Sequence, residues 1–335
     1  MLSKKIRACS LPLVLLITYS HTLCAQDSLI QFKKGEKLPS PVYGMAYSEL
    51  NDGLISIGGA TFTNHETNYI FKYNTQTGKW LNLKRSYEID PMVYGSATYL
   101  GETYDGVIVH GGISNYRNYV AILPDIILYN LSSFRMTSLG VNPNPANHQS
   151  SSFWKDKLYL FGGSTSLKQT KTSRTVEYSQ SLFEFDLKTG LINQLPDLPE
   201  AKQVDGVIID DYLYIIGGFN GTPSTRVDRY DLINKSWQKL VDLKEPLSAY
   251  AITKSDQYIF YIGDYSKLNQ LLVFDTKNLR HHVFKMNFNA RFAGAGIVDG
   301  NLHVFGGLDP NQINKKVTNQ HWYIPVDDIL SRIAE

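Results

Sequence analysis

The chain has 335 residues, and its 33 lysines and arginines nearly balance its 31 aspartates and glutamates, so its formal net charge is only +2. A protein that binds nucleic acid through surface charge needs a clear basic excess on one face, so this balance argues against nucleic acid as a partner. The length is sufficient for one large all-β domain.

The first 25 residues have the pattern of a cleavable export signal. Lys4, Lys5 and Arg7 precede an apolar run at residues 11–17, and Ala25 offers a small residue for cleavage. The apolar run is too short for a membrane-spanning helix, which needs about 20 residues. We therefore expect a signal peptide that ends near Ala25 and no membrane span.

Cleavage at that point would leave a single mature domain at residues 26–335 without any cysteine, because Cys9 and Cys24 both precede the cut. Lipidation of Cys24 is an alternative, but it calls for a small residue in front of the cysteine, and Leu23 is large. The mature chain would lose three cations and carry a net charge of about −1. We expect a secreted or periplasmic monomer without disulfides.

A short apolar strand that ends in two glycines recurs along the chain. Clear copies end at residues 58–59, 111–112, 162–163, 217–218 and 306–307, and a degenerate copy ends at residues 263–264. The copies are about 43 to 55 residues apart, so six units fill the mature chain. An aromatic residue with Asn or Asp, a polar turn and usually a second aromatic follow each pair, as at Tyr73, Asn74 and Trp80. With the stretch before the glycines, each unit is predicted to form four short strands.

At these residues the chain resembles the kelch-repeat family, in which an apolar strand ending in Gly-Gly is followed by a Tyr-Asp element and then a tryptophan. The resemblance covers essentially the whole mature chain. It implies an all-β, six-bladed propeller whose four-stranded antiparallel blades surround a channel. The alternative is a β-sandwich with coincidental glycines. Because the last unit lacks a fourth strand, we expect residues 28–33 to supply it and close the ring. Residues 327–332 are the one place where a helical turn is expected.

In propeller families, ligands usually bind the face formed by the loops after the glycine pairs and by the connectors that enter each unit. Counting 15 residues back from the first glycine aligns Arg291, Lys202 and Asn147 at the strand entrances of units six, four and three. Arginine binds carboxylates well and tyrosine stacks on sugar rings. We predict ligand contacts, around the mouth of the channel, from Arg291, Lys202, Arg117, Tyr116, Arg174, Arg226, His148 and Tyr87. The structural alternative is that strand-opening cations only form local hydrogen bonds.

These features predict an exported module that binds a carbohydrate, possibly acidic, or a protein. The enzymatic alternative is a sugar-modifying activity, since the chain is similar in fold, compartment and cationic mouth to sialate mutarotases (N-acetylneuraminate epimerases). No catalytic residue can be assigned from that similarity. Asp205 and other carboxylates share the face without a diagnostic spacing. The sequence has no zinc-site spacing, nucleophile elbow or phosphate-binding loop, so we expect neither a metal nor a cofactor.

Overall fold

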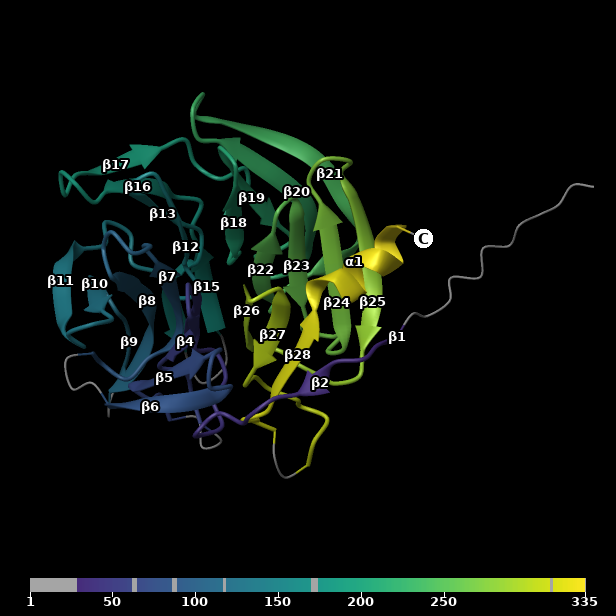
Figure 1. Cartoon of the computed structure of the whole chain (residues 1–335). Helices are drawn as coiled ribbons and strands as arrows, with labels where there is room; N and C mark the ends of the chain where they lie inside the picture. The colour runs from purple at the N-terminus through teal and green to yellow at the C-terminus, as the bar shows by residue number, and fades with distance from the viewer. Residues whose placement is uncertain are drawn as a thin grey trace, which may run out of the picture.

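The computed structural model describes residues 29–61, 65–85, 89–116, 119–169, 174–313 and 316–334. Six antiparallel sheets, or blades, are arranged around a central axis (Figure 1). The expected propeller architecture is therefore confirmed. The expected signal peptide lies outside the described residues.

The first three blades each place their strands in chain order from the axis outward. Blade one contains β3 (Ala46–Leu50), β4 (Gly53–Ile57), β5 (Tyr69–Asn74) and β6 (Lys79–Arg85). Blade two contains β7 (Val93–Tyr99), β8 (Gly106–Tyr116), β10 (Asp125–Asn130) and β11 (Met136–Val141), and β9 (Tyr119–Ile122) pairs with the end of β8. Blade three contains β12 (Ser150–Trp154), β13 (Lys157–Phe161), β16 (Leu182–Asp186) and β17 (Ile192–Leu195), and its loop carries a separate hairpin of β14 (Ser164–Gln169) and β15 (Arg174–Tyr178).

The remaining blades follow the same order. Blade four contains β18 (Gly206–Ile209), β19 (Tyr212–Ile216), β20 (Ser224–Asp231) and the long β21 (Ser236–Leu247). Blade five contains β22 (Ala251–Ser255), β23 (Tyr258–Ile262), β24 (Gln270–Asp275) and β25 (Arg280–Met286). Blade six contains β26 (Gly294–Val298), β27 (Asn301–Phe305) and β28 (His321–Pro325).

The glycine pairs form the corners where the second strand of a blade turns toward the third. In blade one, Gly58 and Gly59 have φ of +69° and +89°, which side chains other than hydrogen disfavour. In blade five, Asp264 replaces the second glycine and is 3% exposed. Its carboxylate accepts the N–H groups of Ser248 and Ser266, both at 2.9 Å, so it ties the incoming connector to the loop. We call the face with these loops and the blade connectors the loop-rich face.

The amino-terminal segment closes the ring, but it does so in two pieces. β2 (Lys33–Lys34) pairs antiparallel with β28 and is the fourth strand of blade six, as expected. β1 (Leu29–Ile30) instead pairs in parallel with β25 and becomes a fifth strand of blade five. Between them, the side chain of Asn287 bonds to both the N–H and the carbonyl of Phe32, each at 3.0 Å. The expected outer strand at residues 28–33 is thus correct for its last residue only.

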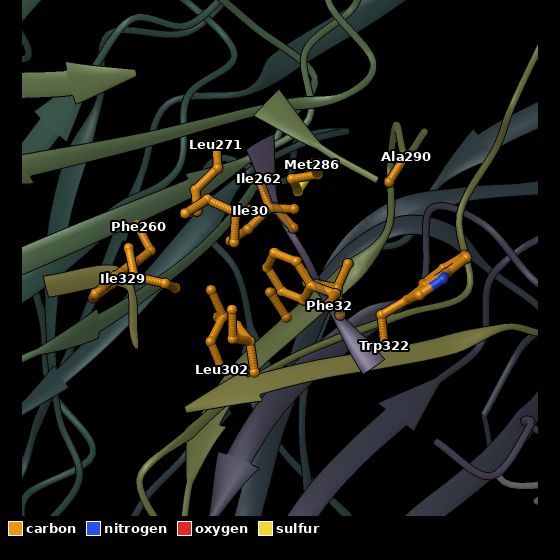
Figure 2. Close-up of a cluster of buried hydrophobic side chains, with 14 of the residues drawn as sticks. Ile30, Phe32, Phe260, Ile262, Leu271, Met286, Ala290, Leu302, Trp322 and Ile329 are labelled. Carbon is orange, nitrogen blue, oxygen red and sulfur yellow. The ribbon is translucent and has the colours of Figure 1, made fainter. Parts of the chain in front are cut away.

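Apolar burial explains why this segment is divided between two blades. Ile30 is fully buried and Phe32 is 5% exposed, whereas Leu29 is 43% exposed. Ile30 and Phe32 lie among buried side chains of both blades, including Leu271 of blade five and Leu302 of blade six (Figure 2). The two apolar residues therefore fill the space between the blades, where both blades shield them from water.

The chain ends in helix α1 (Val326–Ala334), which is longer than the helical turn that the sequence predicted. Asp327 and Asp328 lie in its first turn and Arg332 in its last, which suits the helix dipole at both ends. Ile329 is fully buried in the same cluster as Ile30 (Figure 2). The Arg332 guanidinium also donates to the Leu29 carbonyl at 3.4 Å, so both ends of the described chain meet here.

Two buried histidines join blade six to blade one. His303 Nδ1 and His321 Nε2 are 2.8 Å apart, and the Trp80 indole N–H donates to His321 Nδ1 at 3.4 Å. Only one proton can lie between the two facing ring nitrogens, so the two rings cannot both be protonated in this geometry. Burial lowers the pKa of His303 to about 4, and burial together with His303 lowers the pKa of His321 to about 3.

We expect this pair to make the protein sensitive to acid. In the unfolded chain both rings take up protons as pH falls through about 6.5, whereas in the folded protein they resist protonation until about pH 4 to 3. The free energy of unfolding should therefore fall between pH 6.5 and pH 4, by roughly 3 kcal/mol or more from this pair. Urea unfolding at pH 7 and pH 4 checks this. The difference between the two pH values should shrink in His321→Gln, and an unchanged difference would contradict the assignment.

Candidate functional site

A cavity of about 600 Å3 follows the propeller axis. It is lined by residues of the innermost strand of every blade, which are β3, β7, β12, β18, β22 and β26. Its wall includes hydroxyl groups, such as those of Ser96, Ser150 and Thr253. Clefts and cavities with a few convergent polar groups are the usual places for ligands, so we take this channel and its mouth as the candidate site.

The mouth on the loop-rich face is framed by a run of backbone hydrogen bonds between blades. Each N–H donates to the backbone carbonyl of a residue in another blade, at 2.7 to 3.3 Å. The pairs, donor first, are Phe292 and Ala249, Gly44 and Phe292, Tyr94 and Gly44, and His148 and Tyr94. All five residues are left-handed, with φ between +51° and +61°. For the four that carry side chains this conformation is unfavourable by about 1 kcal/mol or more each. Such local strain is often found at functional sites.

Aromatic side chains of these hydrogen-bonded residues, together with Tyr43, gather at the mouth of the channel. The rings of Tyr94 and His148 stack with centroids 4.1 Å apart, and Phe292 lies 5.1 Å from Tyr94 and 5.7 Å from His148. Tyr43 meets Tyr94 edge-on at 6.1 Å. Gly44 makes room for them, because a Cβ there would lie 2.7 Å from the Tyr94 ring. We call Tyr43, Tyr94, His148 and Phe292 the mouth cluster.

Arg291 places a cation beside the mouth cluster. Its guanidinium carbon lies 4.4 Å from the centre of the Tyr265 ring and 5.6 Å from that of Phe292, and it donates to the Tyr265 carbonyl at 3.2 Å. Tyr265 is 59% exposed. Arg291 also acts electrostatically on Tyr43, although burial raises the pKa of that phenol. The structure therefore brings two of the predicted residues, Arg291 and His148, to one place.

Blade four is one residue shorter than its neighbours at the strand entrance. Isolated bridges pair this entrance with the residue after the glycine pair: Asn147 with Ser164, Arg291 with Leu308 and, in blade four, Gln203 with Phe219. Asn147 and Arg291 lie 15 residues before the first glycine of their pair, but Gln203 lies 14 before Gly217. Gln203, and not Lys202, is thus the equivalent of Arg291, so the alignment from the sequence is wrong by one residue in this blade. The missing residue is the one that would continue the left-handed ring.

The shift places Lys202 inside the protein. Its side chain is fully buried, and its ammonium lies 3.3 Å from the Glu200 carboxylate. Burial lowers the pKa of Lys202, and Glu200 partly opposes that effect. Lys202 is not among the residues that line the channel. A ligand contact at Lys202 stays a prediction, but the observed contacts are structural.

Arg226 belongs to the same buried network. Its Nε lies 2.6 Å from Asp228, which is fully buried, and the bond to Asp228 raises the pKa of the guanidinium. Ser224 of the same strand donates to Glu200 at 3.3 Å. Arg226 therefore holds the loop-side end of β20 and does not line the channel.

The other four predicted residues are only partly placed. Tyr87 and Arg117 lie outside the described residues. For Tyr116 and Arg174 the structure describes the backbone: Tyr116 ends β8 opposite Tyr119, and Arg174 begins β15 opposite Gln169. Both strands project from loops of the loop-rich face, as the prediction requires, and their part in binding stays a prediction.

Two carboxyl groups face the inside of the channel. Asp205 accepts a hydrogen bond from Ser150, and burial raises the pKa of Asp205 to about 6. Glu49, on β3, reaches across to the Ile297 N–H at 2.8 Å and to the Thr253 hydroxyl. Burial also raises the pKa of Glu49, and those two hydrogen bonds oppose the shift. Glu49 therefore links blade one to blades five and six.

Sequence reasoning named Asp205 without a role and missed Glu49, Tyr94 and Phe292. Phe292 could have been found, because it directly follows Arg291, just as His148 follows Asn147. Glu49 carries no signal of its own in the sequence, since its partners lie more than 200 residues away. Within the described ranges, no group of three or more His, Cys, Asp or Glu side chains is arranged to hold a metal ion. No helix of those ranges is long and apolar enough to span a membrane.

Comparison with known proteins finds a matching family model. A family model described as "KLHDC2/KLHL20/DRC7 Kelch-repeats domain" matches residues 44–263, which is more than half of the chain. The matched region begins at the mouth residue Gly44 and ends at the corner glycine of blade five.

Several curated proteins are similar over part of their length. Beta-scruin of Limulus polyphemus is 27% identical over 167 residues, which are 48% of this chain and 18% of that protein. Kelch repeat and BTB domain-containing protein 2 of cowpox virus (strain GRI-90 / Grishak) is 26% identical over 148 residues, 44% of this chain and 25% of that protein. Host cell factor 2 of Homo sapiens is 23% identical over 270 residues, 70% of this chain and 33% of that protein. The chain thus spans a third or less of these relatives.

Proposed function

The chain belongs to the kelch-repeat family, and on that premise we propose that it is an exported interaction module that binds a protein or carbohydrate ligand on its loop-rich face. Kelch propellers typically bind proteins. Export to a secreted or periplasmic location is part of the proposal and rests on the signal-like residues 1–25.

The observation that carries the proposal is the mouth cluster with Arg291 beside it. Clustered, partly exposed aromatic rings and an arginine are the residue types that dominate binding energy at interfaces. Here they are held on strained backbone by a rigid ring of blades. Tyr265 presents an exposed ring with Arg291 on its face, which suits a carboxylate-bearing peptide or an acidic sugar.

A direct test is to screen the mature chain against a display library of random twelve-residue peptides and against a glycan array. Ligands recovered in this way should bind the double variant Arg291→Ala, Tyr265→Ala at least tenfold more weakly. Lys155→Ala is the matched control, because Lys155 lies 4.2 Å over the Trp154 ring in a turn of the opposite face. Absence of any ligand, or ligands that bind the double variant and the wild type equally, would contradict the proposal.

A second candidate function, modification of a sugar, is favoured by the channel carboxyls alone. Burial raises the pKa of Asp205 to about 6 and also raises that of Glu49, which is the condition that a general acid or base near neutral pH requires. Mixing the protein with a freshly dissolved sialic acid anomer and following the anomeric signals by proton NMR tests it. Equilibration no faster than in buffer would discard this candidate.

A further inference from the structure

Asp205 has an unusual position within the channel wall. In each blade, one residue of the innermost strand pairs with the residue just before the glycine pair. These residues lie at one level of the channel, and in the other five blades they are Ala46, Ser96, Ser150, Ala251 and Gly294. Asp205 precedes Gly206, which pairs with Ile215, so it takes this position in blade four. It is the one ionisable residue at this level, and two of its companions carry hydroxyl groups.

The partners of Asp205 do not satisfy a carboxylate. Its side chain accepts one hydrogen bond, from Ser150, and no described residue forms an ion pair with it. Asp205 is partly buried, and a carboxylate that has lost much of its water is destabilised unless positive charge or hydrogen-bond donors replace it. Glu49 differs, because it has two donors and is attracted by Lys254. Within the channel, Glu49 thus has several hydrogen-bond donors from the protein, whereas Asp205 has one.

The short entrance of blade four places no residue of the left-handed ring above Asp205. In blades two, three and six, the ring residue above this level is Tyr94, His148 or Phe292. Blade four lacks that residue, and the neighbouring ring residue in blade five is the small Ala249. The aromatic side chains of the ring therefore come from blades two, three and six, whereas Asp205, which lines the same cavity, belongs to the blade without a ring residue.

We propose that the channel beneath the mouth is a binding site for a primary ammonium group, which pairs with the Asp205 carboxylate and donates to hydroxyl oxygens of Ser96 and Ser150. An ammonium carries three donors and no acceptor, so one carboxylate and neighbouring hydroxyls match it. Rings of the mouth cluster would attract the cation on its way in. The group is either a lysine side chain of a protein ligand or the amine of an amino sugar. This inference rests on the proposed function and adds the chemistry that the ligand must carry.

The experiment compares each amine with its neutral acetylated form by isothermal titration calorimetry. One pair is a Gly-Ser-Lys-Ser-Gly peptide and its Nε-acetyl-lysine form, and the other is glucosamine and N-acetylglucosamine. At least one amine should bind ten times more tightly than its acetylated form, and the pair that does so identifies the source. Asp205→Asn should abolish the difference, and a thermal unfolding scan confirms that the variant is folded.

Asp299→Asn is the matched control, because Asp299 lines the other end of the channel and asparagine tolerates its positive φ of 47°. It should leave the amine preference intact. Failure of both amines to bind more tightly than the acetylated forms, or the same preference in Asp205→Asn, would overturn the inference. Neither result would affect the Arg291 test, so the two proposals fail separately.

A pH series gives a second readout. Amine affinity should fall as pH drops through about 6, because protonation removes the charge of Asp205. The groups that interact with Asp205 electrostatically are Tyr47, Tyr250 and Tyr261, and burial raises the pKa of all three phenols, so they stay neutral over this range. His148 and Glu49 line the same cavity, and burial raises the pKa of Glu49 as well, so the variants are compared over the same pH range. The fall should therefore persist in His148→Gln and disappear in Asp205→Asn.

Discussion

Ile30→Ala should lower the free energy of unfolding by about 3 kcal/mol. The side chain is fully buried between blades five and six, so its truncation would leave a cavity in their shared core (Figure 2). The substitution should also loosen β1, whose two residues pair with β25 of blade five. Urea unfolding followed by tryptophan fluorescence measures the change.

Leu29→Ala is the matched control for this prediction. Leu29 belongs to the same short strand but is 43% exposed, so its truncation should change the free energy of unfolding by less than about 0.5 kcal/mol. Equal effects at the two positions would mean that β1 does not dock as the structure shows. Closure of the ring would then depend on β2 alone.

Gly263→Ala should destabilise the protein by about 4 kcal/mol, or prevent folding. Gly263 has φ of +74°, which already disfavours alanine by about 1 to 2 kcal/mol. A Cβ at this position would also lie 2.0 Å from the Ala290 carbonyl oxygen, so the connector into blade six would have to move. Because Arg291 and Phe292 follow directly, the mouth should be disturbed as well.

Gly190→Ala separates the two contributions. Gly190 has nearly the same φ, +73°, but nothing lies within 4 Å of an added Cβ. We expect a loss of about 1 kcal/mol from the backbone conformation alone. Thermal unfolding of both variants provides the comparison, and similar losses would show that the corner in blade five is not tightly packed.

The fold was predictable because each blade repeats the same local solution. A glycine corner and an alternating apolar strand recur six times, so errors in one unit are corrected by the others. The degenerate unit at Gly263 and Asp264 still follows the pattern. There, hydrogen bonds from the Ser248 and Ser266 N–H groups to the Asp264 carboxylate hold the corner that two glycines form in the other blades. The split of the amino-terminal segment was not predictable, because it depends on the space between blades five and six that buries Ile30.

The site was predictable only where it follows the repeat. Arg291 was found because it lies at a fixed distance from a glycine pair, whereas for His148 that count reaches only its neighbour Asn147. The same count failed at Lys202, since one residue is missing from blade four and nothing in the sequence around it marks the deletion. Asp205 and Glu49 gain their properties from residues of other blades, such as Ser150, Thr253 and Ile297, and no local pattern encodes those neighbours.

Hydrogen exchange of the mature protein, with and without a ligand recovered from the peptide or glycan screen, tests the central claim that ligands bind at the mouth. We expect protection on binding in the segments that frame it, at residues 43–45, 147–149, 203–206, 264–268 and 290–293. Protection confined to the turns of the opposite face, such as residues 155–156, 210–211 and 299–300, would contradict the account.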